Sequence, residues 1–191
     1  MKELAAVLAV VISVSSYIPY LFGIYKKTNK PHAYSWLVWT IVTWVIFAAQ
    51  ISSGAGLAAA MFAVVGTFTF IVFILSIFYG EKNRTKLDLT LLILALLAVL
   101  AWVVTKDPTL SVVLSTVIDI LAFGPTARKC WNKPFEETIS THALVGVSYG
   151  LTLIALSSYS FDTFFYPGVM AIMNNVFVGY VLLRRRVKTV K

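Results

Sequence analysis

The chain has 191 residues, of which 59% are hydrophobic and 13% are charged, and its mean hydropathy is +0.86. A water-soluble domain with one core does not use that much apolar surface, which excludes the ordinary soluble classes. The net charge of +8 is spread over several segments and not concentrated in one, so we do not expect nucleic-acid binding. The single cysteine, Cys130, excludes an internal disulfide.

Apolar runs recur along the whole chain, and each is long enough to cross a hydrocarbon layer ~30 Å thick as a helix of about 20 residues. The runs lack the alternation of apolar and polar residues that is typical of barrel strands, so they are predicted to be helices. The sequence therefore predicts an all-α integral membrane protein. Its seven predicted transmembrane helices are residues 3–25, 34–52, 57–79, 88–105, 109–127, 138–157 and 162–184.

Lysine and arginine are distributed unequally between the two sides that seven spans would create. Two of them, Lys2 and Lys106, fall on the side of the amino terminus, and fourteen fall on the other side. An excess of Lys and Arg marks the cytoplasmic face. We therefore expect the amino terminus outside and the carboxyl terminus in the cytoplasm, in a plasma membrane that we take to be prokaryotic, with membrane lipids as neighbours.

A short pattern occurs twice, 103 residues apart. Asn29-Lys30-Pro31 follows the first predicted helix, and Asn132-Lys133-Pro134 follows the fifth. Two units of three helices share one orientation only if an odd number of helices separates them. We therefore predict two parallel triple-helix bundles joined by a linker helix (3+1+3), with residues 1–80 as the first bundle, 81–107 as the linker and 108–191 as the second bundle with a basic tail. Repeats related in this way occur in transporters, whose substrate site lies between them.

Two short motifs occur in this layout: Pro19-Tyr20 followed by Lys26-Lys27-Thr28, and Pro125-Thr126 followed by Arg128-Lys129. In its layout and these motifs the chain resembles the SWEET and PQ-loop (MtN3-like) transporter superfamily, including semi-SWEETs and, more distantly, the PnuC vitamin transporters. Neither motif has the glutamine. The resemblance implies alternating access, with Pro19 and Pro125 as hinges. It does not carry over a sugar specificity, because helix six has no tryptophan and asparagines occur on helix seven but not on helix three.

Asp119 is the acidic residue that we place within the hydrocarbon, where a carboxylate usually marks a pathway, a proton relay or an internal pair. We read it as part of a substrate site and of a proton-coupling path that His142 could join; the alternative is a neutral aspartic acid that holds helices together. Ser115, Asp119, Ala122 and Thr126 share one helix face, as do Ser13, Ser16, Tyr17 and Tyr20. These stripes either line a cavity or serve as close helix contacts.

The remaining candidates come from helices two and seven. Of Asn174 and Asn175, whose side chains point about 100° apart, we expect Asn174 to face the cavity. Trp39 is a candidate stacking platform, and Trp36 is expected in the interfacial belt. The predicted substrate-binding residues are thus Asp119, Asn174, Asn175, Ser16, Tyr17 and Trp39.

We expect no metal site and no cofactor, because His32 and His142 have no carboxylate or cysteine at ligand spacing. Gly146-Val147-Ser148-Tyr149-Gly150 spells a nucleophile-elbow pattern inside a predicted helix, which does not suit hydrolysis, so we do not expect an enzyme. The sequence favours a transporter for a small polar solute such as a sugar, amino acid or vitamin. The alternative is a non-transporting receptor or lipid-handling protein of the same fold, and the oligomeric state is open.

Overall fold

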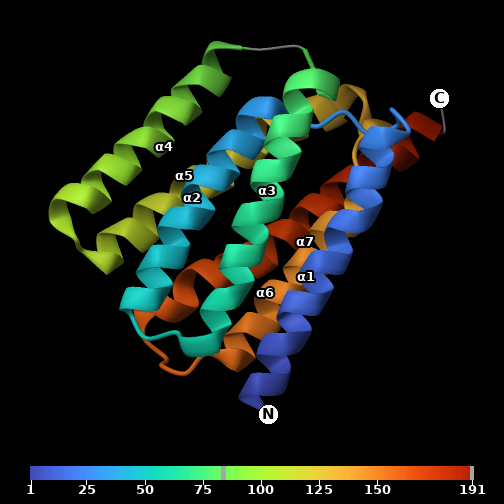
Figure 1. Ribbon diagram of the computed structural model, residues 1–191. Helices are drawn as coiled ribbons and strands as arrows, with labels where there is room; N and C mark the ends of the chain where they lie inside the picture. The colour runs from blue at the N-terminus through green and yellow to red at the C-terminus, as the bar shows by residue number, and fades with distance from the viewer. Residues whose placement is uncertain (83–84, 190–191) are drawn as a thin grey trace.

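The computed structural model describes residues 1–82 and 85–189 (Figure 1). Within these ranges the chain forms seven α-helices, two short 3₁₀ helices and no strand, which confirms the all-α class. The elements are α1 (Lys2–Tyr25), α2 (Ala33–Ser52), η1 (Gly56–Ala58), α3 (Ala59–Tyr79), α4 (Lys86–Thr105), α5 (Pro108–Asn132), η2 (Pro134–Glu136), α6 (Ile139–Ala155) and α7 (Phe161–Thr189).

Six helical segments in the described part of the chain are long and apolar enough to cross a membrane: α1, α2, η1 with α3, α4, α5 and α7. α6 is also apolar but has 17 residues, at the lower end of the length that a bilayer requires. Large apolar side chains cover the outside of the bundle; Leu97 and Leu100 of α4, for example, are 53% and 57% exposed. These features indicate an integral membrane protein.

Several predicted boundaries differ from the structure. α5 continues to Asn132 and α7 to Thr189, past the predicted ends at 127 and 184. The added turns contain Lys and Arg, which are good helix formers and are favoured at the carboxyl end of a helix. Pro31 lies in the connection before α2, and Pro134 begins η2.

Side-chain caps fix the beginnings of α4 and α5. At α4, Asp88 Oδ2 accepts from the backbone N–H of Thr85 over 2.6 Å, and Thr85 Oγ1 accepts from that of Asp88 over 3.4 Å, which makes a capping box. At α5, Asp107 Oδ1 accepts from the N–H groups of Thr109 and Leu110, and Pro108 occupies the first helical position.

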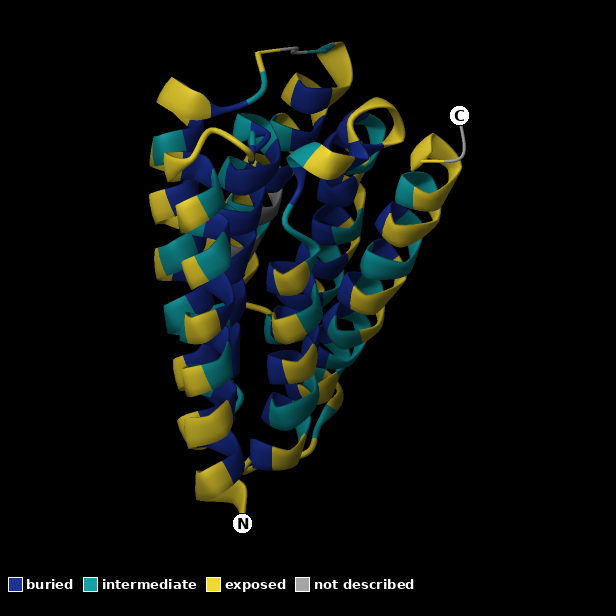
Figure 2. Ribbon diagram, turned by 90° about the vertical axis from the view of Figure 1, so that its right-hand side faces the viewer, coloured by how far each residue is buried: buried dark blue, intermediate teal, exposed yellow. Residues whose placement is uncertain are grey.

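The helices pack in reciprocal pairs. α1 packs against α3 and α6, while α5 packs against α7 and α2. α2 also packs on α3, and α6 packs on α7. α4 lies at the edge of the bundle, in contact with α2 and α5 (Figure 1). Buried residues face the interior and exposed ones face outward along each helix (Figure 2). The two polar stripes predicted for α1 and α5 are buried at every position.

The chain termini lie at opposite ends of the bundle (Figure 1). Connections 26–32 and 133–138, the carboxyl end of α3 and the carboxyl end of α7 lie at one end of the bundle, which we term the basic end (Figure 1). Connections 53–55, 106–107 and 156–160 lie at the other, which we term the N-terminal end. Arg84 and Lys191, two of the fourteen basic residues assigned to one side, lie outside the described residues.

Candidate functional site

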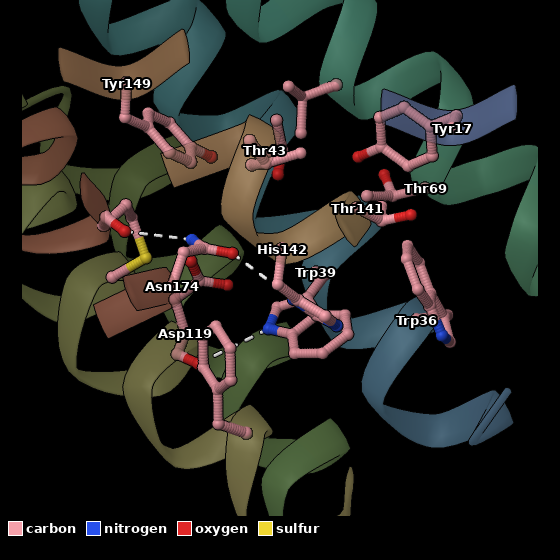
Figure 3. A pocket seen from close by; sticks show the side chains of 14 residues that line it. Tyr17, Trp36, Trp39, Thr43, Thr69, Asp119, Thr141, His142, Tyr149 and Asn174 are labelled. Atoms are coloured by element: carbon pink, nitrogen blue, oxygen red, sulfur yellow. Dashed lines mark hydrogen bonds between the residues drawn. The ribbon is translucent and has the colours of Figure 1, made fainter. Parts of the chain in front are cut away.

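A pocket lies in the centre of the bundle, and every helix except α4 contributes to its wall (Figure 3). The water-accessible volume of the pocket is about 40 Å³, which is enough for a few water molecules. The lining residues are Tyr17, Trp36, Trp39, Thr43, Val65, Thr69, Asp119, Phe123, Thr141, His142, Val145, Tyr149, Met170 and Asn174. Four of the six predicted substrate-binding residues are among them, namely Tyr17, Trp39, Asp119 and Asn174.

Asp119 is the acidic residue of this wall, and it is 4% exposed. Its Oδ2 accepts a hydrogen bond from the hydroxyl of Tyr166 over 2.8 Å. Its Oδ1 has no hydrogen-bond partner in the part of the chain that the structure describes. Tyr166 is itself fully buried and packs against Phe62 and Tyr149, with ring centroids 5.9 Å away in both cases. A rigid aromatic cluster therefore holds one carboxylate oxygen and leaves the other available to a ligand.

Asn174 and His142 meet in the same wall, near Asp119 (Figure 3). His142 Nδ1 lies 3.3 Å from Asn174 Oδ1, and Asn174 Nδ2 donates to the carbonyl of Met170 over 2.9 Å. The other ring nitrogen of His142, Nε2, lies 3.7 Å from Glu137 Oε1. His142 thus extends from the pocket toward the basic end, next to the residues that close that end.

The tryptophans of α2 form the aromatic side of the pocket. The Trp39 ring stands edge-on between Trp36 and Phe123, with centroids 5.0 Å away in both cases. Its Nε1 points at the backbone carbonyl of Asp119, at 3.5 Å. The assignment of Trp36 to the interfacial belt is wrong, because the residue is 3% exposed, lines the pocket and donates from Nε1 to the hydroxyl of Tyr20 over 3.1 Å.

Two of the predicted binding residues do not line the pocket. Ser16 is buried, but its hydroxyl donates to the carbonyl of Ser13, and its own carbonyl accepts from Thr141 Oγ1 over 2.7 Å. Asn175 is exposed on the outer surface of α7 and donates to the carbonyl of Ala171. Adjacent residues of a helix point in different directions, so the wall that holds Asn174 excludes Asn175.

Several other lining residues were not predicted from the sequence. Thr43, Thr141 and Tyr149 are uncharged polar residues within hydrophobic helices, where such residues are common at plain helix contacts. Thr69 of α3 lines the pocket, whereas Thr67, two residues earlier, is exposed and donates to the carbonyl of Ala63. The packing of the helices therefore decides that Thr69, and not Thr67, lines the pocket.

An ion pair closes the basic end of the bundle. Lys129 Nζ binds the carboxylate of Glu137 and also donates to the backbone carbonyls of Lys30, over 2.8 Å, and Glu136, over 3.2 Å. The two copies of the repeated segment are thereby tied together. Arg185 of α7 donates to the carbonyl of Glu137 over 2.6 Å.

Glu137 lies in the connection before α6 and is fully buried in charged surroundings. Burial by itself would raise the pKa of its carboxyl group, but the charge of Lys129 and the neighbouring His142 outweigh it and lower the pKa from its usual 4.5 to about 2. Two further acidic residues are buried at the basic end: Glu137 and, in the first turn of α4, Asp88. Asp88 accepts from Arg128 over 3.3 Å and lies 3.5 Å from His32 Nε2. Each histidine therefore lies beside one carboxylate, His32 beside Asp88 and His142 beside Glu137.

Backbone contacts and small side chains close the N-terminal end. The N–H of Ser157 donates to the carbonyl of Ala55 over 3.2 Å, next to a cluster of alanines from α1, η1, α3 and α6. Gln50 Nε2 donates to the carbonyls of Asp162, over 2.9 Å, and Thr163, over 3.3 Å. The pocket therefore lies between two closed ends.

Three prolines lie inside helices in the described part of the chain. Pro19 in α1 and Pro125 in α5 are the expected hinge positions, and Pro167 in α7 was not anticipated. Because proline has no N–H, Pro167 leaves the carbonyl of Thr163 without its helical partner, and Gln50 of α2 supplies the hydrogen bond instead.

The nucleophile-elbow pattern lies within α6, as expected. The hydroxyl of Ser148 donates to the carbonyl of Leu144 in the preceding turn, and the described residues before the serine form no strand. Its first glycine serves packing: a Cβ at Gly146 would lie 3.3 Å from Cβ of Asn174 and 2.7 Å from Nδ2 of Asn175. No group of three or more His, Cys, Asp or Glu at metal-binding distances occurs among residues 1–82 and 85–189.

Comparison with known proteins identifies no relative: no family model, no curated protein and no solved structure matches this chain. The arrangement of the pocket itself must therefore indicate what the site does. It offers a free carboxylate oxygen, threonine and tyrosine hydroxyls and aromatic faces, which together can bind a small solute away from water.

Proposed function

We propose that the chain is a membrane transporter that moves a small polar solute by alternating access, as the resemblance to the SWEET and PQ-loop superfamily implies. The observation that carries the proposal is the central pocket, lined by polar and aromatic side chains, with an ion pair at the basic end of the bundle and backbone contacts at the N-terminal end. Such contacts on both sides of a central site are what alternating access requires, because a transporter opens one end at a time.

The pattern of helix contacts supports the 3+1+3 organisation. If α1, α2 and α3 correspond to α5, α6 and α7, the contact of α1 with α6 becomes the contact of α5 with α2. The contacts of α1 and α2 with α3 likewise become those of α5 and α6 with α7. This correspondence of contacts is expected if a rotation about an axis along the bundle superposes one triple-helix unit on the other, with α4 as the linker between them.

The charge distribution supports an orientation in which the basic end faces the cytoplasm and the amino terminus lies outside. α6, with 17 residues, spans the membrane in this scheme as a short helix that begins just after the basic end. The site would then lie between a cytoplasmic gate at Lys129 and Glu137 and an outer gate at Gln50, Ala55 and Ser157.

Pro19 and Pro125 are the proposed hinges. Each lies in the half of its helix nearest the basic end, and each removes one helical hydrogen bond. Bending at these points would separate the two units at the cytoplasmic gate without disturbing the contacts at the outer one. Asp119 and His142 remain the candidates for proton coupling. Asp119 lines the pocket, and His142 lies between the pocket and Glu137.

A disulfide across the outer gate tests the proposal. In a chain whose native Cys130 is replaced by serine, Ala55→Cys and Ser157→Cys place two thiols at residues that share a backbone hydrogen bond. In sealed vesicles we expect counterflow of a radiolabelled solute, chosen from a panel of amines, amino acids, sugars, nucleosides and vitamins, to stop on oxidation and resume on reduction.

The single-cysteine chain with Ala55→Cys alone is the matched control and should be insensitive to the oxidant. Flux that continues through the oxidised double-cysteine protein would contradict alternating access at this gate. Saturable binding with no flux for any member of the panel would favour the receptor or lipid-handling alternative.

A further inference from the structure

We propose that the central pocket selects a small organic cation, an ammonium or amidinium group on a flat or short apolar body, with Asp119 as its counter-ion. The inference rests on the proposed transport function and names the class of solute that the site takes. Three properties of the pocket carry it: the unpaired carboxylate oxygen, the prior use of its N–H donors, and its aromatic walls.

The first property is the charge at Asp119. Its Oδ1 is buried and has no hydrogen-bond partner among the described residues, and neither Lys nor Arg lines the pocket. The one basic side chain of the wall, His142, is engaged with Asn174 and lies beside Glu137. A buried carboxylate is costly unless a cation or a set of donors compensates it. The protein leaves that role to a ligand.

The second property is that both tryptophan N–H groups of the pocket, and one of the two N–H groups of Asn174, are already used by the protein. Trp36 donates to Tyr20, and Asn174 donates to the carbonyl of Met170. Trp39 Nε1 is directed at the carbonyl of Asp119. The hydroxyl protons of Thr69 and Thr141 also point to backbone carbonyls.

The oxygens of these two threonines therefore present lone pairs to the pocket, beside the free oxygen of Asp119. An ammonium or amidinium group has only donors, which matches these acceptors. A carboxylate or phosphate has only acceptors, which does not. An uncharged polyol would leave the charge of Asp119 without compensation.

The third property is the aromatic lining. Tyr17, Trp36, Trp39, Phe123 and Tyr149 surround the same space (Figure 3). Aromatic faces attract a desolvated cation and also stack on flat apolar bodies. The volume of about 40 Å³ in this state is enough for an ammonium or amidinium group, and a ring attached to that group needs the wider pocket of an open state.

An isosteric series tests the inference on the purified, detergent-solubilised chain. Benzamidine, benzamide and benzoate share one ring and one planar head but carry positive, zero and negative charge; benzylamine and benzyl alcohol form a second matched pair. Binding is followed by the quenching of tryptophan fluorescence, since Trp36 and Trp39 line the pocket, and by the rise in melting temperature that a ligand of the folded state produces.

We expect benzamidine and benzylamine to bind at least about tenfold more tightly than their uncharged partners, and benzoate not to bind. Asp119→Asn should abolish this preference, whereas Glu3→Gln, the same chemical change at an exposed position of α1, should keep it. The charge preference of the unmodified chain does not depend on whether the Asp119 variant folds.

Two results would overturn the inference. One is equal or tighter binding of benzamide or benzoate, and the other is no binding of either cation. If an uncharged solute then shows counterflow in vesicles that both cations fail to inhibit, the transport proposal stands and the cation selectivity is wrong. If no solute shows flux, the transport proposal falls as well.

Discussion

Lys129 and Glu137 form a salt bridge in which neither side chain reaches solvent, with side-chain exposures of 2% and 0%. The pair joins the last turn of α5 to the connection before α6, and through the carbonyl of Lys30 it also holds the connection between α1 and α2. Because each buried charge is stabilised only when its partner lies beside it, the pair holds the connections at the basic end in one arrangement.

Removing one partner of this pair should destabilise the protein strongly. We expect Glu137→Gln to lower the free energy of unfolding by about 3–5 kcal/mol, because it leaves the buried ammonium of Lys129 uncompensated. The double variant Lys129→Met with Glu137→Gln should recover much of the loss. The melting temperature in detergent measures both effects.

The partly exposed pair Lys133 and Glu81 is the control, since its Lys133 side chain is 48% exposed. We expect Lys133→Ala to change the free energy of unfolding by no more than about 1 kcal/mol. A loss at Glu137 no larger than this would show that the buried pair does not hold the gate.

The same carboxylate should make stability depend on pH in acid. The folded-state pKa of Glu137, about 2, lies below its usual 4.5. Its contribution is therefore fully present above about pH 4.5 and is lost as the pH falls toward 2. The groups around it are Lys129 from α5, His142 from α6, Tyr20 from α1 and Arg185 from α7.

Melting temperatures measured between pH 7 and pH 2 should fall less steeply in Glu137→Gln than in the unmodified chain. Parallel curves for the two proteins would contradict the lowered pKa.

Gln50 and Pro167 should be coupled, because Gln50 donates to the carbonyl that Pro167 leaves free. We expect Gln50→Leu to cost about 1–3 kcal/mol, since the buried carbonyl of Thr163 and the partly buried carbonyl of Asp162 lose a donor. Pro167→Ala supplies a helical N–H for Thr163, so Gln50→Leu should cost less in that background. A double-mutant cycle on unfolding free energies gives the coupling. Additive effects would show that Gln50 does not compensate for the proline.

Gly146 and Gly150 should respond differently to added side chains, although they lie one turn apart on α6. A Cβ at Gly146 meets Asn174 and Asn175, whereas one at Gly150 meets nothing within 4 Å. We expect Gly146→Val to cost about 1–3 kcal/mol through overpacking against α7. Gly150→Ala should leave stability unchanged or raise it by up to about 1 kcal/mol. Melting temperatures of the two variants compare them directly, and equal tolerance at both glycines would contradict the close contact of α6 with α7.

The sequence by itself determined that the chain is helical and membrane-embedded, because apolar runs of this length have no other stable solution in lipid. It also indicated the polar stripes of α1 and α5, since a helical period fixes which residues share a face. From these stripes Asp119 and Tyr17 could be placed in the interior before the structure was known.

Only the tertiary structure decided which interior residues meet. Asn174 reaches the pocket and Asn175 does not, and Trp36 leaves the expected belt to bind Tyr20. The pairing of His142 with Glu137 and Asn174, and of His32 with Asp88, joins residues whose roles their local sequence did not reveal. Periodicity specifies the direction of a side chain on its own helix, but the rotation and depth of the neighbouring helices fix what it faces, and these depend on packing between residues far apart in the chain.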